Sequence, residues 1–120
     1  MANPNIVNVT TIQGKTAAVA VTTTATALVS NAASSNKIFK LNVLTIANID
    51  GANAATVNVD IFKNQTTAFR LAQVIVVPAG STLVVISKDT SVYLEENDSL
   101  RVTASANSRL EAVCSYEEIS

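Results

Sequence analysis

Two stretches near the C-terminal end decide the fold: Ser-Leu-Arg-Val-Thr-Ala-Ser (99–105) and Leu-Glu-Ala-Val-Cys-Ser-Tyr (110–116). Apolar and polar residues alternate in both, and the turn signal Asn107-Ser108 lies between them. Because successive side chains of a β-strand point to opposite faces, this alternation predicts two half-buried strands in an antiparallel hairpin. The residues expected to point inward are Leu100, Val102, Ala104, Leu110, Ala112 and Cys114.

Similar short runs continue toward the N-terminus, with turn signals roughly every 8–12 residues. The predicted strands are 6–13, 16–21, 25–30, 37–49, 55–62, 67–73, 74–77, 82–87 and 91–94. The turns expected between them include Gly14-Lys15, Asp50-Gly51, 63–66 and Pro78-Ala79-Gly80. We therefore predict a single all-β domain over residues 1–120, an antiparallel β-sandwich of jelly-roll-like form with about eight strands.

Several expectations about individual strands follow from the side-chain pattern. In segment 37–49, Phe39, Leu41 and Val43 share one face, whereas Leu44 and Ile46 have the opposite parity. A β-bulge explains such a switch, and so does a strand buried on both faces. The pattern further places Phe69 and Leu71 inward, and Asn58, Asp60 and Arg70 outward.

Composition excludes several classes of function. Hydrophobic residues make up 48% of the chain, charged residues 14% and aromatic residues 4%, and the formal net charge is −1. Scattered cations and few aromatic side chains argue against nucleic-acid binding, and no apolar run approaches the ~20 residues of a membrane helix. The N-terminal residues show no pattern typical of a signal peptide.

The residues that usually carry catalysis are scarce. The chain contains no histidine, so the commonest general base and the commonest metal ligand are missing. No nucleophile or phosphate-binding motif surrounds the serines, threonines or three glycines. Cys114 is the only cysteine and shares the parity of core residues, so we expect a buried thiol. These observations predict a protein without catalytic residues or a cofactor.

The densest group of carboxylates is the turn Glu95-Glu96-Asn97-Asp98. Glu95, Glu96 and Asp98 are candidate oxygen ligands for a hard cation such as Ca²⁺. The alternative is a solvated turn, which we favour because the spacing matches no EF-hand loop.

Segments 41–46, 74–77 and 83–86 are apolar on both faces. The outer face of a small sandwich normally contacts solvent, so this pattern predicts a homo-oligomer in which another copy covers part of the surface. The alternative is that these strands lie in the centre of the fold.

The C-terminal half resembles a small β-sandwich that recurs in virions of tailed phages. The matching residues are Val-Pro-Ala-Gly-Ser-Thr-Leu-Val-Val (77–85), Tyr-Leu-Glu-Glu-Asn-Asp-Ser-Leu-Arg-Val-Thr-Ala-Ser (93–105) and 110–119. The opening 1–17 is similar to small virion proteins of cyanobacterial and marine phages. Where the family pattern has glycine before the aspartate, this chain has Asn97, which also tolerates a positive φ.

The resemblance implies a capsid cement or decoration protein that binds the outside of the shell, after assembly in the bacterial host cytoplasm. The expected partners are identical copies, as a homotrimer, and the major capsid protein. Alternatives are a tail, fibre or head–tail adaptor component and, in another class, a carbohydrate-binding module for host surface glycans. The candidate contacts are an extended N-terminal arm (1–9) and one loop, through Asn5, Ile6, Val7, Val9, Asn31, Ser34, Ser35 and Asn36. The arm has an alternative role as the first strand of its own sandwich.

Overall fold

The computed structural model describes residues 7–120 of the chain. Nine β-strands and one short 3-10 helix make up the regular structure of this part. They are β1 (Ile12–Val21), β2 (Thr26–Ser30), β3 (Ile38–Asn48), β4 (Ala55–Lys63), β5 (Thr67–Val77), β6 (Thr82–Ile86), η1 (Lys88–Thr90), β7 (Val92–Leu94), β8 (Ser99–Ala104) and β9 (Leu110–Ile119). None of these elements is a helix long and apolar enough to cross a membrane.

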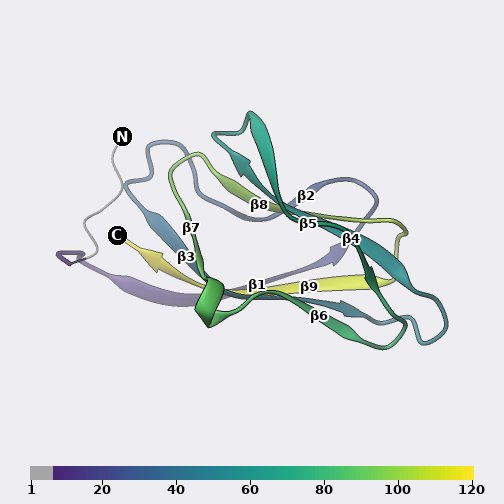
Figure 1. Ribbon diagram of the computed structural model, residues 1–120. Coiled ribbons are helices and arrows are strands. Elements are labelled where there is room, and N and C mark those ends of the chain that lie inside the picture. Colours follow the sequence, from purple (N-terminus) through teal and green to yellow (C-terminus); the bar gives the residue numbers. More distant parts are fainter. Residues whose placement is uncertain (1–6) are drawn as a thin grey trace.

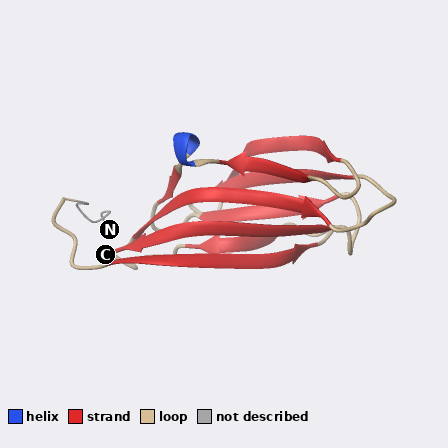
Figure 2. Cartoon of the chain, turned by 90° about the horizontal axis from the view of Figure 1, so that it is seen from below, coloured by secondary structure: helices blue, strands red, loops and turns tan. Residues whose placement is uncertain are grey.

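The strands form two antiparallel sheets that pack face to face (Figure 1). The larger sheet has the order β1-β9-β3-β6. Along one edge of β3, β6 pairs with residues 44–47 and β7 pairs with residues 39–41. The smaller sheet has the order β2-β8-β4-β5. Figure 2 shows the strands as two layers, with η1 at one side. The chain thus forms the predicted β-sandwich, with the crossing strand order of a jelly roll.

The core lies between the two sheets and is built mostly from branched aliphatic side chains. The central strand β3 contributes Leu41, Leu44 and Ile46, all fully buried, and the facing sheet contributes Leu100 and Val102. Each such side chain stabilises the fold by about 1.5–3 kcal/mol through removal of apolar surface from water. The inward residues predicted for 99–105 and 110–116 are all buried.

The parity switch predicted in β3 is confirmed as a bulge. The register between β3 and β9 shifts between Leu41 and Val43, so Leu41 and Leu44 both face the core. Val43 instead lies opposite Ser115 and is half-buried. A bulge lets one strand change faces without leaving the sheet.

The predicted start of the sandwich is wrong. The structure has no strand between residue 7 and residue 11, and β1 runs without a break through the expected turn at Gly14-Lys15. The reason is the ten-residue antiparallel ladder between β1 and β9, whose tertiary pairing outweighs the local turn preference of glycine. Lys15 adds an ion pair across this ladder, at 3.1 Å from Glu118.

Two turns adopt the conformation that their residues favour. In the β4–β5 hairpin, Asn64 and Gln65 have φ of 55° and 54°, as a type I′ turn requires at both central positions. Asn97 has a φ of 68°, a left-handed conformation that asparagine tolerates, and it lies in the turn before β8.

The predicted strands 67–73 and 74–77 are one strand, β5, whose register with β4 shifts at two places. Val59 pairs with Ala72 and Val57 with Ile75, so two β5 residues lie opposite Asn58. The second of them, Val74, has a φ of 50° and donates its backbone N–H to Asn58 Oδ1 at 2.6 Å. A β-branched residue in the left-handed region is strained.

We expect Val74→Asn to raise the free energy of unfolding by about 1 kcal/mol, because asparagine tolerates a positive φ and valine does not. Urea denaturation measures the change. Val76→Asn is the matched control, since Val74 and Val76 are both 58% exposed and only Val74 has a positive φ. An equal effect of the two substitutions would contradict the assignment of strain to Val74.

Candidate interaction surfaces

The two loops singled out in the sequence meet at one end of the sandwich. The loop between β2 and β3 joins the acidic turn through two backbone hydrogen bonds of 2.9 Å each: Asn31 N–H donates to Asp98 O, and Asn97 N–H donates to Asn31 O. A third bond of 2.7 Å runs from Asn36 N–H to Glu96 Oε2. The sequence predicts each loop but not their contact.

The buried side chain of Asn31 fixes the loop between β2 and β3 through hydrogen bonds. Its side chain donates to the carbonyls of Lys37 (2.8 Å) and Leu94 (3.1 Å), and its Oδ1 accepts from Ser35 Oγ. Asn31 was expected to contact a partner, but it is only 1% exposed. Its side chain instead positions the loop between β2 and β3. Of the other expected contacts in this loop, Ser34 and Asn36 are exposed and Ser35 is half-buried.

The carboxylates of the acidic turn are engaged within the protein. Lys63 Nζ lies 2.7 Å from Asp98 Oδ2 and 3.0 Å from Glu95 Oε1. Asp98 Oδ1 also accepts the backbone N–H of Asn64 at 2.9 Å. The hydrogen bond to Asp98 is the main reason that the pKa of Lys63 is raised, and desolvation opposes it. Within residues 7–120, no group of three or more acidic or cysteine side chains is arranged to hold a metal ion.

A hollow of about 260 Å³ lies beside this turn. Its lining residues are Ala33, Ser34, Asn64, Glu96 and Asn97. Glu96 Oε1 is buried and has no hydrogen-bond partner within the described part of the chain. This end of the sandwich is thus a polar surface stabilised by hydrogen bonds between loops.

The expected N-terminal arm is described only in part, because Asn5 and Ile6 lie outside the described residues. Val7 is 84% exposed, and Val9 is half-buried. The arm joins the sheet where the N–H groups of Thr10 and Thr11 both donate to Ser120 O, at 2.7 and 3.0 Å.

The outer face of the smaller sheet carries charge. Asp60 is fully buried there, although alternation places it on the outer face. Arg101 from β8 binds it through Nε–Oδ1 and Nη2–Oδ2 contacts of 2.9 and 3.3 Å, and Arg70 from β5 contacts Oδ2 at 3.0 Å. The Arg101 guanidinium also lies 3.9 Å from the centre of the Phe62 ring. The two arginines cover the carboxylate and give this face a hydrated surface.

The edge strand β5 leaves apolar residues exposed. Phe69 and Leu71 were both expected inward, yet they are 60% and 41% exposed, because β5 is the edge strand of the smaller sheet and its register with β4 shifts beside Leu71. The other exposed apolar residues of this strand are Val74, Ile75 and Val76. An apolar sheet edge of this length is available for contact with another molecule.

The outer face of the larger sheet is different, because small uncharged side chains cover most of it. We call it the β1/β9/β3/β6 face. Cross-strand pairing places its residues in rows, of which the clearest is Ala18–Val113–Thr45–Val84. The next row is Ala20–Glu111–Ala47–Thr82. Among these eight residues, Glu111 alone is charged.

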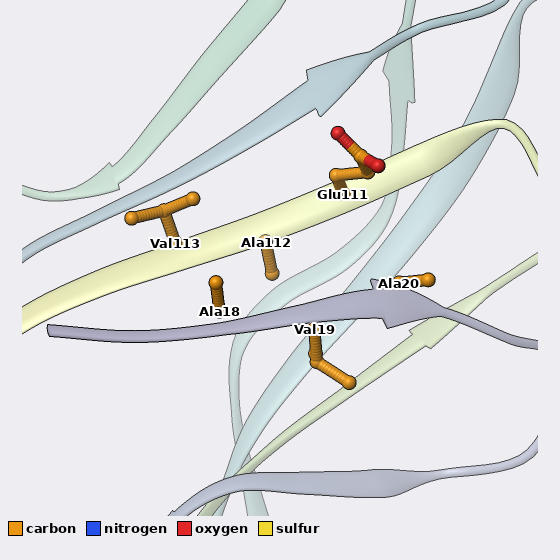
Figure 3. A pocket seen from close by; sticks show the side chains of 6 residues that line it. All are labelled: Ala18, Val19, Ala20, Glu111, Ala112 and Val113. Atoms are coloured by element: carbon orange, nitrogen blue, oxygen red, sulfur yellow. The ribbon is translucent and has the colours of Figure 1, made fainter.

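Figure 3 shows part of this face, where β1 and β9 lie side by side. A shallow hollow of about 250 Å³ lies over these strands. Its lining residues are Ala18, Val19, Ala20, Glu111, Ala112 and Val113. Val113 is 40% exposed and Val84 is 56% exposed. Exposed valines beside short alanines make a flat apolar surface, which is typical of an interface rather than of a hydrated sheet.

Comparison with known proteins gives a likeness in fold. No protein-family model matches the chain, and no curated protein sequence matches it significantly. A solved structure described as "Bacillus endospore appendages form a novel family of disulfide-linked pili" is similar, with a TM-score of 0.52 and 16% sequence identity. The match covers 100% of this chain and 96% of that chain. The two chains therefore share the same sandwich from end to end.

Proposed function

We propose that this protein is a non-enzymatic structural subunit that associates with copies of itself and decorates the outside of a phage capsid. The observation that carries the self-association is the contrast between the two outer faces. One carries two arginines over a buried carboxylate, whereas two adjacent rows of the other hold a single charged residue, Glu111, and expose Val84 and Val113. The full-length likeness in fold to a subunit of pili supports a structural role. The capsid location rests on the sequence resemblance to virion proteins.

In this proposal a homotrimer contacts neighbouring capsomers through the exposed residues of the polar loop end and through the N-terminal arm. Three linked contacts raise the effective concentration, so modest individual contacts hold the subunit on the shell. Ser34 and Asn36 are the loop residues placed to make such contacts, because both are exposed.

Purified protein added to undecorated shells is expected to raise their melting temperature, since ligand bound only to the intact shell stabilises it by mass action. Differential scanning calorimetry of shells with and without the protein measures this shift. Removal of residues 1–8 should reduce the shift while the truncated domain still folds. An unchanged melting temperature at saturating protein would contradict the capsid role, and binding to a glycan array without shells would favour a carbohydrate-binding module.

A filament subunit is the second candidate, favoured by the likeness to the pilus protein. The pili named in that description are linked by disulfides. In this chain Cys114 is fully buried, and burial raises the pKa of its thiol to about 11, so it is poorly placed to form such a link. Filaments of this protein would be held by non-covalent contacts. Negative-stain electron microscopy of concentrated protein distinguishes filaments from discrete oligomers.

A further inference from the structure

The β1/β9/β3/β6 face is graded in side-chain size from one edge to the other. Along the β1 edge, residues 14–20 present the short column Gly14, Thr16, Ala18 and Ala20, and the larger Ile12, 57% exposed, lies beyond it at the start of the strand. The opposite edge presents Thr82 and Val84 from β6 and the larger Tyr93 from β7. Tyr93 is 40% exposed, and no atom lies within 4 Å of the position that a Cβ on Gly14 would take. One edge thus has space where the other edge projects.

Charge is graded along the same face. Beyond the apolar rows, pairing places Gly14, Glu117, Lys40 and Tyr93 in one further row. Within residues 7–120, neither Lys40 nor Glu117 belongs to an ion pair closer than 4.0 Å. Lys40 and Glu117 lie opposite each other on β3 and β9 without forming such an ion pair, so each side chain can also reach an opposite charge on a partner.

A two-fold arrangement exists in which these two gradients complement each other. A two-fold axis running along the strands, between β9 and β3, places the β1 edge of one copy over the β6/β7 edge of the other. Ala18 then faces Val84 of the second copy, and Gly14 faces Tyr93. The same axis places Lys40 over Glu117 of the second copy, and the contact repeats reciprocally because a two-fold interface is isologous.

The alternative two-fold axis runs across the strands. It places small residues opposite small residues, such as Gly14 over Ala20 of the second copy. It also places Glu117 over Glu111, which is unfavourable because like charges oppose each other. The axis along the strands places Glu111 over Ala47 of the second copy rather than over another carboxylate, so size and charge both favour this axis.

We propose that the β1/β9/β3/β6 face is the docking surface for a second copy of this chain, related by a two-fold axis parallel to the strands between β9 and β3. The inference rests on the proposed self-association and assigns it a surface. Four strands and four rows span about 500 Å² on each copy, from the usual strand spacing and rise. The pair then buries about 1,000 Å², below the range of stable specific interfaces and typical of weak ones, so the dimer forms in a concentration-dependent manner. A homotrimer would need a separate, heterologous contact.

The first test compares one added carboxylate on each outer face. Ala18→Glu places a charge in the centre of the proposed interface, and Thr103→Glu places one on the outer face of β8 in the other sheet. Sedimentation equilibrium is expected to show a dimer dissociation constant raised at least about hundredfold by Ala18→Glu, since an unpaired charge is buried there. Thr103→Glu should leave it unchanged. Thermal melting of each monomer checks that both variants fold.

The second test reverses the charge pair. Lys40→Glu and Glu117→Lys are each expected to weaken the dimer at least about tenfold, because each places like charges opposite one another. The double variant restores the complementary pair and should recover most of the affinity. Equal affinities for the wild type and all single variants would overturn the proposed face while leaving self-association intact. A wild-type chain that stays monomeric at every concentration would overturn self-association itself.

Discussion

Replacing Arg101 by alanine is expected to lower the free energy of unfolding by about 3 kcal/mol, because it leaves the buried Asp60 carboxylate with too few partners. Arg101 makes two of the three contacts to this carboxylate, at 2.9 and 3.3 Å. Its guanidinium also packs over the Phe62 ring, and that contact is lost as well. Arg70 still contacts Asp60 Oδ2 at 3.0 Å in this variant. The loss of unfolding free energy is therefore at the lower end of the range for a broken buried ion pair.

Arg70→Ala is the matched comparison. Its side chain is 45% exposed, against 23% for Arg101, so solvent screens its interaction with Asp60 more strongly. We therefore expect a cost of about 1 kcal/mol or less. Urea denaturation at neutral pH measures both variants.

Asp60→Asn in the Arg101→Ala background tests the cause of the loss. It removes the buried negative charge but keeps the shape of the side chain, so part of the stability should return. If Arg101→Ala and Arg70→Ala cost the same amount, or if Asp60→Asn gives no recovery, the loss does not come from an uncompensated carboxylate.

Most strands could be predicted because side-chain alternation reports directly on which face is buried. The change of parity after Val43 indicated either a bulge in β3 or a strand buried on both faces, and the register shift with β9 shows that it is a bulge. The turn predicted at Gly14-Lys15 was wrong because this part of β1 pairs with β9, whose residues are about a hundred positions away in the sequence. Local turn preferences contain no information about such a partner.

Alternation also predicts which face a residue occupies but not whether that face is covered. Asp60 was placed outward, and it does lie on the outer face, yet Arg101 and Arg70 bury it. Phe69 was placed inward, yet it is exposed on an edge strand. Both outcomes depend on the order of strands in the sheet, which a local pattern does not contain.

The polar loop end shows the same limit. Lys63 had no special place in the sequence, although it forms the ion pairs that hold Glu95 and Asp98. These residues meet because the hairpin after β4 and the turn before β8 are at the same end of the smaller sheet. The acidic turn alone contained no signal for Lys63, because carboxylates in a solvated turn need no basic partner, and only the burial of Asp98 makes one necessary.

Asn31 is the residue on which the architecture of this end depends most. Substitution by alanine is expected to lower the free energy of unfolding by about 3 kcal/mol, because the carbonyls of Lys37 and Leu94 then lose their donor in a buried site. Thermal or urea denaturation measures the loss. A cost below about 1 kcal/mol would mean that water replaces the amide, and that the side chain is not what holds the loop.

Asn48 offers a matched control at the other end of the sandwich. It is 4% exposed and donates to the carbonyls of Asn53 and Val77, at 3.0 and 2.9 Å. Asn48→Ala should therefore cost about as much stability as Asn31→Ala, without disturbing the loop that displays Ser34 and Asn36. At a temperature at which both variants are folded, only Asn31→Ala should weaken binding to capsid shells. Equal losses of binding would mean that stability alone governs attachment, and that the loop between β2 and β3 does not contact the shell.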